Sequence, residues 1–116
     1  VKIFILNNHY MGMVRQWQEL LHGNRLSESY MDSLPDFVKL AESFGATGLR
    51  VSKPGDMDDL IKEMIKIKGP VICDVVVDPK ENCFPMIPSG STHDQMLLGP
   101  NDKLEGEISE EGMVLV

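Results

Sequence analysis

The sequence predicts an α/β fold with a mostly parallel sheet flanked by helices. Short apolar runs alternate with segments whose apolar residues recur at helical spacing, in the order strand, helix, helix, strand, helix, strand. The run 71–77 is almost continuously apolar, which is typical of a strand covered on both faces of a parallel sheet. Glycine or proline lies at the ends of several segments, where it separates one element from the next.

The first two predicted elements are a buried strand and an amphipathic helix. Residues 1–6 are largely apolar and stop at Asn7-Asn8, and the helix runs from Met11 to about Gly23. Periodicity alone favours packing of the apolar face against a sheet and places Arg15 at a solvated helix end. The apolar face comprises Met13, Val14, Trp17, Leu20 and Leu21, and the polar face Arg15, Gln16, Gln18, Glu19 and His22.

The remaining helices and strands follow a polar loop at 24–34. Asp36 begins a second helix, which ends at Gly45, and a brief strand is predicted around 49–51. Acidic residues at 56–59 place negative charge in the first turn of a third helix, which is a favourable position beside the helix dipole. That helix ends at Gly69-Pro70, and the strand at 71–77 completes the order.

The chain divides by composition into two predicted parts. Residues 1–79 carry the periodic segments and form the predicted domain, whereas 80–116 form an extended C-terminal arm with a possible short strand at 113–116. The arm holds seven acidic residues and two lysines, and so carries -5 of the net charge of -7. Without a basic face, binding to nucleic acid or to an anionic membrane is not expected.

The apolar runs are far too short for a membrane-spanning helix, and no signal-peptide pattern opens the chain. Cys73 and Cys83 show no zinc-binding spacing and are expected to be reduced thiols. The chain begins at Val1 within a predicted strand and without an initiator methionine, so we expect a larger polypeptide upstream.

Two asparagines stand where a ligand is expected in an open α/β sheet. Asn7-Asn8 follow the first strand and precede a helix, at the edge where such sheets bind ligands. Their amide oxygens suit a hard cation such as Mg²⁺, and the helix N-terminus suits a phosphate. The alternative is a turn and helix cap, which is the more common use of Asn-Asn in this position.

Several ordered motifs resemble acetolactate synthase (acetohydroxyacid synthase) large catalytic subunits. The segment 5–8, Ile-Leu-Asn-Asn, followed by 12–18, Gly-Met-Val-Arg-Gln-Trp-Gln, is similar to the end of the thiamine-diphosphate motif and the following active-site helix. The resemblance continues through 27–32, 35–42 and 84–90, and therefore covers most of the chain in order. It implies a partial thiamine-diphosphate-binding fold.

The resemblance also implies roles for individual residues. Asn8 would bind Mg²⁺ through its side chain and Tyr10 through its backbone carbonyl. Asn8, Gly12 and Met13 would contact the cofactor. Met13, Val14 and Trp17 would line the substrate channel, with Trp17 shaping the pocket for the second 2-oxo acid. Residues 11–29 would form a mobile capping segment, and 83–98 an arm that folds over the cofactor and excludes water.

The activity implied by the resemblance belongs to a larger polypeptide. That enzyme condenses two pyruvates, or pyruvate and 2-oxobutyrate, with loss of CO₂, in the biosynthesis of branched-chain amino acids. It would use thiamine diphosphate and Mg²⁺, with FAD bound elsewhere. It would form a homodimer or homotetramer that could bind a regulatory small subunit, in the cytoplasm, or in the plastid if it comes from a plant or alga. The Gly-Asp-Gly of the motif is absent here, so the fragment alone is predicted to be inactive.

Two alternatives stay open at this point. The first is another thiamine-diphosphate enzyme, such as an oxalyl-CoA decarboxylase, a pyruvate oxidase or a glyoxylate carboligase, although 12–14 with Trp17 favours acetolactate synthase. The second is a non-catalytic interaction module that uses an exposed sheet edge. An unpaired edge also predicts that the isolated chain is marginally stable or self-associates.

Overall fold

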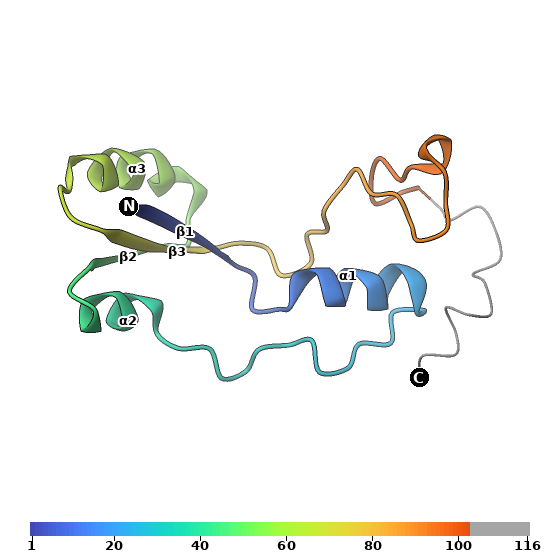
Figure 1. Ribbon diagram of the computed structural model, residues 1–116, viewed down its shortest axis with the longest axis horizontal. Coiled ribbons are helices and arrows are strands. Elements are labelled where there is room, and N and C mark those ends of the chain that lie inside the picture. The colour runs from blue at the N-terminus through green and yellow to red at the C-terminus, as the bar shows by residue number, and fades with distance from the viewer. Residues whose placement is uncertain (103–116) are drawn as a thin grey trace. The chain divides into compact units, whose positions relative to one another are not determined.

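A computed structural model of the chain describes residues 1–102, which form two compact units (Figure 1). Unit 1 contains residues 1–10 and 31–80. Unit 2 contains residues 11–30 together with the described residues from Glu81 onward. The predicted boundary between 79 and 80 falls beside the end of unit 1 at Lys80, and it stays a prediction. The predicted strand at 113–116 lies outside the described residues.

Unit 1 is built on a three-stranded parallel sheet, as the element order predicts. Its strands are β1 (Lys2–Asn7), β2 (Thr47–Val51) and β3 (Val71–Val76), arranged in the order β1-β3-β2. Strand β3 is central, because it pairs with β1 on one side and with β2 on the other, and most of its residues are buried. A strand covered on both faces in this way explains the nearly continuous apolar sequence. The α/β prediction is therefore confirmed.

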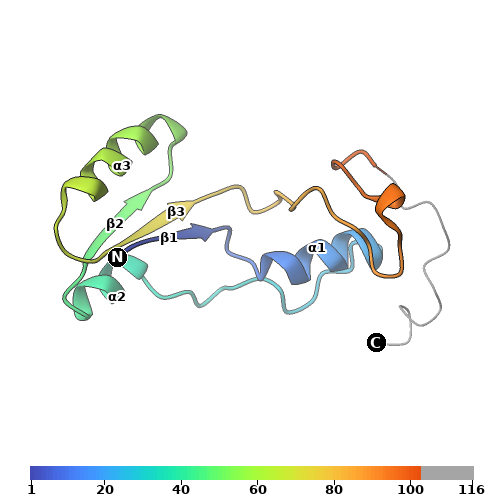
Figure 2. The same cartoon turned by 45° about the horizontal axis from the view of Figure 1, so that its top comes forward.

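One face of the sheet carries the apolar core of unit 1. Helix α3 (Met57–Lys66) lies on the opposite side of the sheet from helix α2 (Phe37–Ser43) (Figure 2). Alternate residues of β3 belong to the core on the α3 side, where Met64 is almost completely buried. The buried core comprises Val51, Met64, Val71, Cys73 and Val75.

The other face of the sheet receives helix α2 at close range. The predicted start of this helix is confirmed, because the Asp36 carboxylate accepts hydrogen bonds from the backbone N–H groups of Val38 at 3.1 Å and Lys39 at 3.3 Å. Gly48 of β2 lies directly beneath the α2 backbone. A Cβ atom added at Gly48 would lie 2.5 Å from the carbonyl oxygen of Val38. A side chain at position 48 would therefore force the helix away from the sheet.

Unit 2 contains helix α1 (Gly12–Leu21) and part of the C-terminal arm. Within the arm, Met86 and Leu97 form an antiparallel bridge, with N–H to O distances of 2.9 and 2.8 Å. A short 3-10 helix (His93–Gln95) lies between the two bridged residues. Among residues 1–102, no helix has the length and apolar character needed to cross a membrane.

The two cysteines differ in their surroundings, although neither forms a disulfide. Cys73 is buried in the core of unit 1, and this burial, together with the neighbouring Asp74 carboxylate, raises the pKa of its thiol. Cys83 lies exposed in unit 2. A raised thiol pKa lowers the thiolate fraction at neutral pH, so Cys73 is suited to packing rather than to nucleophilic chemistry.

We predict that Gly48→Ala destabilises the fold by about 1–3 kcal/mol, because the new methyl group meets α2 backbone rather than a flexible side chain. Urea denaturation followed by circular dichroism measures the free energy of unfolding. Gly55→Ala is the matched control, since a Cβ atom there has nothing within 4 Å. Equal free energies for the two variants would contradict the close approach of α2 to β2.

Candidate functional site

The two asparagines at the end of β1 form a tight turn. The Asn7 side-chain oxygen accepts from the His9 N–H at 3.1 Å, and the Asn8 side-chain oxygen accepts from the Tyr10 N–H at 3.0 Å. His9 between them has a φ of 59°, in the left-handed region that residues with side chains seldom occupy. Its carbonyl accepts from the Met31 N–H at 2.8 Å. Both side chains therefore shape the backbone that carries Asn8 and Tyr10.

The chemistry of this turn fits part of a Mg²⁺ site. An amide oxygen has two lone pairs, so the Asn8 side chain can accept from Tyr10 and still offer an electron pair to a cation. Together with the Tyr10 carbonyl it supplies two neutral oxygen ligands of the roughly six that Mg²⁺ takes. Among residues 1–102, no group of three or more His, Cys, Asp or Glu side chains is placed to hold a metal ion. The turn therefore fits a partial ligand set.

Helix α1 begins with an N-terminus suited to an anion. Its N-cap residue, Met11, makes no side-chain capping hydrogen bond, and the first turn contains no acidic residue. The N-terminal N–H groups of a helix carry partial positive charge and are a common phosphate-binding feature. Gly12 and Met13, which are the predicted cofactor contacts, open this turn. In the chain, only Met11 separates Tyr10 from Gly12.

The exposed side of α1 is the apolar one. Met13, Val14 and Trp17 lie on one side of the helix. All three are exposed, and the exposed fraction of Trp17 is 48%. The burial of this stripe in a core, which periodicity alone favours, is therefore wrong for the described structure. The solvated position expected for Arg15 is also wrong, because Arg15 is buried. The predicted channel residues thus share an accessible surface.

The buried side of α1 is polar because it binds the C-terminal arm. The Gln16 side chain, only 1% exposed, donates to the Cys83 carbonyl at 3.0 Å and accepts from the Cys83 N–H at 2.7 Å. Arg15 forms an ion pair with Glu19 at 2.8 Å, and both side chains bond Asn82. These contacts give the buried side chains of Arg15 and Gln16 their hydrogen-bond partners. They hold the arm at residues 82–83.

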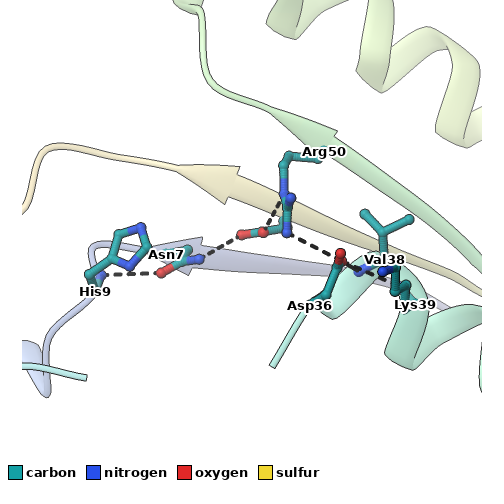
Figure 3. A network of polar contacts seen from close by, with 7 residues as sticks. Asn7, His9, Asp36, Val38, Lys39 and Arg50 are labelled. Carbon is teal, nitrogen blue, oxygen red and sulfur yellow. Dashed lines mark hydrogen bonds and ion pairs between the residues drawn. The ribbon is translucent and has the colours of Figure 1, made fainter. Parts of the chain in front are cut away.

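A polar network near the carboxyl ends of the strands centres on Asp74, which sequence reasoning missed. Asp74 lies in the middle strand β3 and is 1% exposed. Its carboxylate accepts from Asn7 at 3.0 Å and from Arg50 at 2.8 Å, and Arg50 also approaches Asp36 at 3.4 Å (Figure 3). The available signal was a single charged residue inside an otherwise apolar run.

These features, a parallel sheet with an amide-rich turn leading into an uncapped helix, agree with a cofactor-diphosphate-binding domain. Residues 1–75 match the family model described as thiamine pyrophosphate enzyme, C-terminal TPP binding domain. The match spans well over half of the chain, and the chain belongs to this family. Its three-stranded sheet with flanking helices is a partial thiamine-diphosphate-binding fold, as the resemblance implied.

Curated proteins that are similar to this chain are named as acetolactate synthases. The chain is 42% identical over 99 residues to the acetolactate synthase large subunit of Haemophilus influenzae, a match that covers 84% of this chain and 17% of the relative. It is 45% identical over 98 residues to the acetolactate synthase large subunit of Cyanidium caldarium, with the same two coverages. The mitochondrial acetolactate synthase catalytic subunit of Saccharomyces cerevisiae is 46% identical over 97 residues, which are 84% of this chain and 14% of the relative. The chain thus spans about a sixth of the length of the first two.

We predict that Gln16→Ala loosens the arm at Cys83. Losing the paired hydrogen bonds should raise the exchange rate of the Cys83 amide by roughly 2- to 10-fold, as expected for a hydrogen bond of ordinary net strength. Hydrogen–deuterium exchange measures this rate. Gln18→Ala is the matched control, because the Gln18 amide donates to the Ser27 carbonyl instead. Equal acceleration in both variants would contradict a specific role for Gln16.

Proposed function

We propose that this chain is the C-terminal part of the cofactor-binding domain of an acetolactate synthase catalytic subunit. The whole enzyme would decarboxylate pyruvate and join the remaining two-carbon unit to pyruvate or to 2-oxobutyrate, in branched-chain amino-acid biosynthesis. One observation carries the proposal: 42–46% identity, over 84% of this chain, to proteins named as acetolactate synthases. Those names favour this function over that of other thiamine-diphosphate enzymes.

The proposed binding roles follow from the chemistry of the chain's own residues. Asn8 and Tyr10 would hold Mg²⁺ through neutral oxygens, and the N–H groups at Gly12 and Met13 would face the diphosphate. Thiamine diphosphate, when bound, supplies the group that accepts electrons during decarboxylation. The arm from Cys83 to Leu98 would exclude water from the reacting groups. Other parts of the whole enzyme would supply the remaining metal ligands and bind the FAD.

The proposed substrate contacts lie on the exposed side of α1. Met13, Val14 and Trp17 present apolar side chains that need a partner surface or ligand, and their exposure supports a role as a channel wall. The large, rigid indole of Trp17 is suited to shaping a pocket that distinguishes substrates differing by one methylene.

Assembly and location follow the same comparison. We propose a homodimer or homotetramer of the whole subunit, and a small-subunit partner, because relatives such as isozyme 3 of Escherichia coli are named large subunits. The predicted cytoplasmic or plastid location stays a prediction. The Saccharomyces cerevisiae relative is named as mitochondrial.

A non-catalytic interaction module is the second candidate function, and one observation favours it. Within the described residues, β1 pairs with β3 alone, so its other edge is open. Leu6 on this strand is 70% exposed, and Ile3 and Phe4 are also exposed. An open apolar edge is a template for pairing with another chain. A module of this kind would bind neither Mg²⁺ nor thiamine diphosphate.

We predict that Asn8→Ala weakens the binding of Mg²⁺ and of thiamine diphosphate together, each by about 10-fold or more, in the whole catalytic subunit. The reason is that the cation links the protein to the diphosphate, so losing a ligand of one weakens both. Isothermal titration of the apoprotein measures both affinities. Asn101→Ala, at an exposed position in the arm, is the control. Unchanged affinities in Asn8→Ala would contradict the enzyme proposal and favour the interaction module.

We predict that Trp17→Leu lowers the preference for 2-oxobutyrate over pyruvate as second substrate by roughly 10- to 200-fold, the range available from one methylene in an apolar pocket. Competition between the two 2-oxo acids, followed by product analysis, gives the ratio. Phe44→Leu is the matched control, because Phe44 is an exposed aromatic residue of unit 1. A product ratio unaffected by Trp17→Leu would remove Trp17 from the substrate pocket.

A further inference from the structure

We infer that Asp74 is a positioning residue for the metal-binding turn, and that it acts through Asn7. The inference rests on the proposed role of Asn8 and Tyr10 in binding Mg²⁺, and it adds a residue 64 positions farther along the chain than Tyr10. Asp74 does not contact the proposed metal ligands itself. Its effect would pass through one hydrogen bond, from the Asn7 amide nitrogen to the Asp74 carboxylate, at 3.0 Å.

The Asp74 carboxylate is buried and has a partner on each outer strand. Asp74 is 1% exposed and lies on the central strand, between the two outer strands. Each carboxylate oxygen has its own partner: Oδ1 accepts from Nδ2 of Asn7 on β1, and Oδ2 accepts from Nε of Arg50 on β2. The Arg50 Nε lies 2.8 Å away and supplies the opposite charge that a buried carboxylate requires.

The buried carboxylate determines the orientation of the Asn7 amide. An ionised carboxylate can only accept hydrogen bonds, so the Asn7 group that faces Asp74 must be its NH₂. The opposite orientation would bring two acceptors together in a buried place. With Nδ2 fixed toward Asp74, the Asn7 oxygen faces the His9 N–H, at 3.1 Å. The Asp74 charge therefore selects the amide orientation that the turn uses.

The Asn7 amide is connected to the proposed metal-binding residues through His9. His9 stands between Asn8 and Tyr10 with a φ of 59°, a conformation that needs support from its surroundings. The Asn7 oxygen holds the His9 N–H, and the Met31 N–H holds the His9 carbonyl at 2.8 Å. Tyr10 is thereby placed where its N–H reaches the Asn8 oxygen at 3.0 Å. The series Arg50, Asp74, Asn7 and His9 is continuous (Figure 3).

A purely structural role is the competing explanation, in which Asp74 ties the three strands together and the turn forms independently. The two explanations differ in one respect. If Asp74 acts through Asn7, its effect on Mg²⁺ affinity disappears once Asn7 has lost its amide. If Asp74 only stabilises the sheet, its effect on affinity is independent of Asn7 and adds to that of the Asn7 variant.

The test is a double-mutant cycle in the whole catalytic subunit, with Asp74→Asn, Asn7→Ala and both changes together. Isothermal titration of the apoprotein with Mg²⁺ in the presence of saturating thiamine diphosphate gives the affinities, and thermal melting of each apoprotein gives its stability. Each single variant should weaken Mg²⁺ binding by roughly 10- to 100-fold, the usual effect of removing a residue that orients a metal ligand. The double variant should bind Mg²⁺ within about twofold of Asn7→Ala alone. Asp59→Asn is the control, because Asp59 is an exposed carboxylate that pairs with Lys62.

The outcomes separate this inference from the proposed function. If Asn8→Ala weakens binding but Asp74→Asn binds Mg²⁺ as the unmodified subunit does, the inference is wrong and the proposed function stands. Additive effects in the double variant would also overturn the inference. If Asn8→Ala itself leaves binding unchanged, the proposed function fails. Should Asp74→Asn not fold, Asp74→Glu takes its place in the cycle, because it keeps a carboxylate for Arg50 but shifts that carboxylate relative to Asn7. An effect of Asp74→Glu on Mg²⁺ affinity that disappears in the Asn7→Ala background supports the inference, and no effect or an additive one overturns it.

Discussion

The burial of one negative charge in the middle strand is the constraint on which unit 1 depends. A carboxylate at Asp74 is tolerated in the sheet only because both outer strands bring a donor to it. That requirement fixes the residues near the carboxyl ends of β1 and β2, and Arg50 extends the connection to Asp36 at the start of α2. The hydrogen bonds and ion pairs of Asp74 and Arg50 therefore join three strands and one helix. Replacing either of these side chains would remove a charged partner of the other.

The two faces of the sheet are held to their helices by different kinds of contact. The face toward α3 is apolar, and its side chains contribute mainly through the area that they remove from water. The face toward α2 is specified by polar partners and by the close approach at Gly48. Apolar contacts tolerate small shifts, whereas hydrogen bonds to a buried charge do not. The polar face therefore defines where the turn after β1 lies, and the apolar face supplies much of the driving force for folding.

Much of the fold was predictable from the sequence, and less of the site. The order of the elements, and the glycines that end them, predicted the parallel sheet. Asp36 predicted the start of a helix, which the structure confirms. Periodicity could not orient α1, because it identifies which residues share a face but not which face is covered. The role of Asp74 depends on partners 67 and 24 residues away, a pairing that no local pattern contains. Asn8 and Tyr10 were identified through resemblance, and their binding role stays a prediction.

The attachment of the arm to α1 has a consequence for how this chain can change over evolutionary time. Gln16 recognises position 83 through the backbone N–H and carbonyl, which every residue type except proline provides. Residue 83 can therefore be replaced by any residue type other than proline without loss of these two hydrogen bonds. Position 16 has no such freedom, since an amide side chain is what supplies both a donor and an acceptor. Sequence variation in related chains should consequently be unequal at the two ends of one interaction.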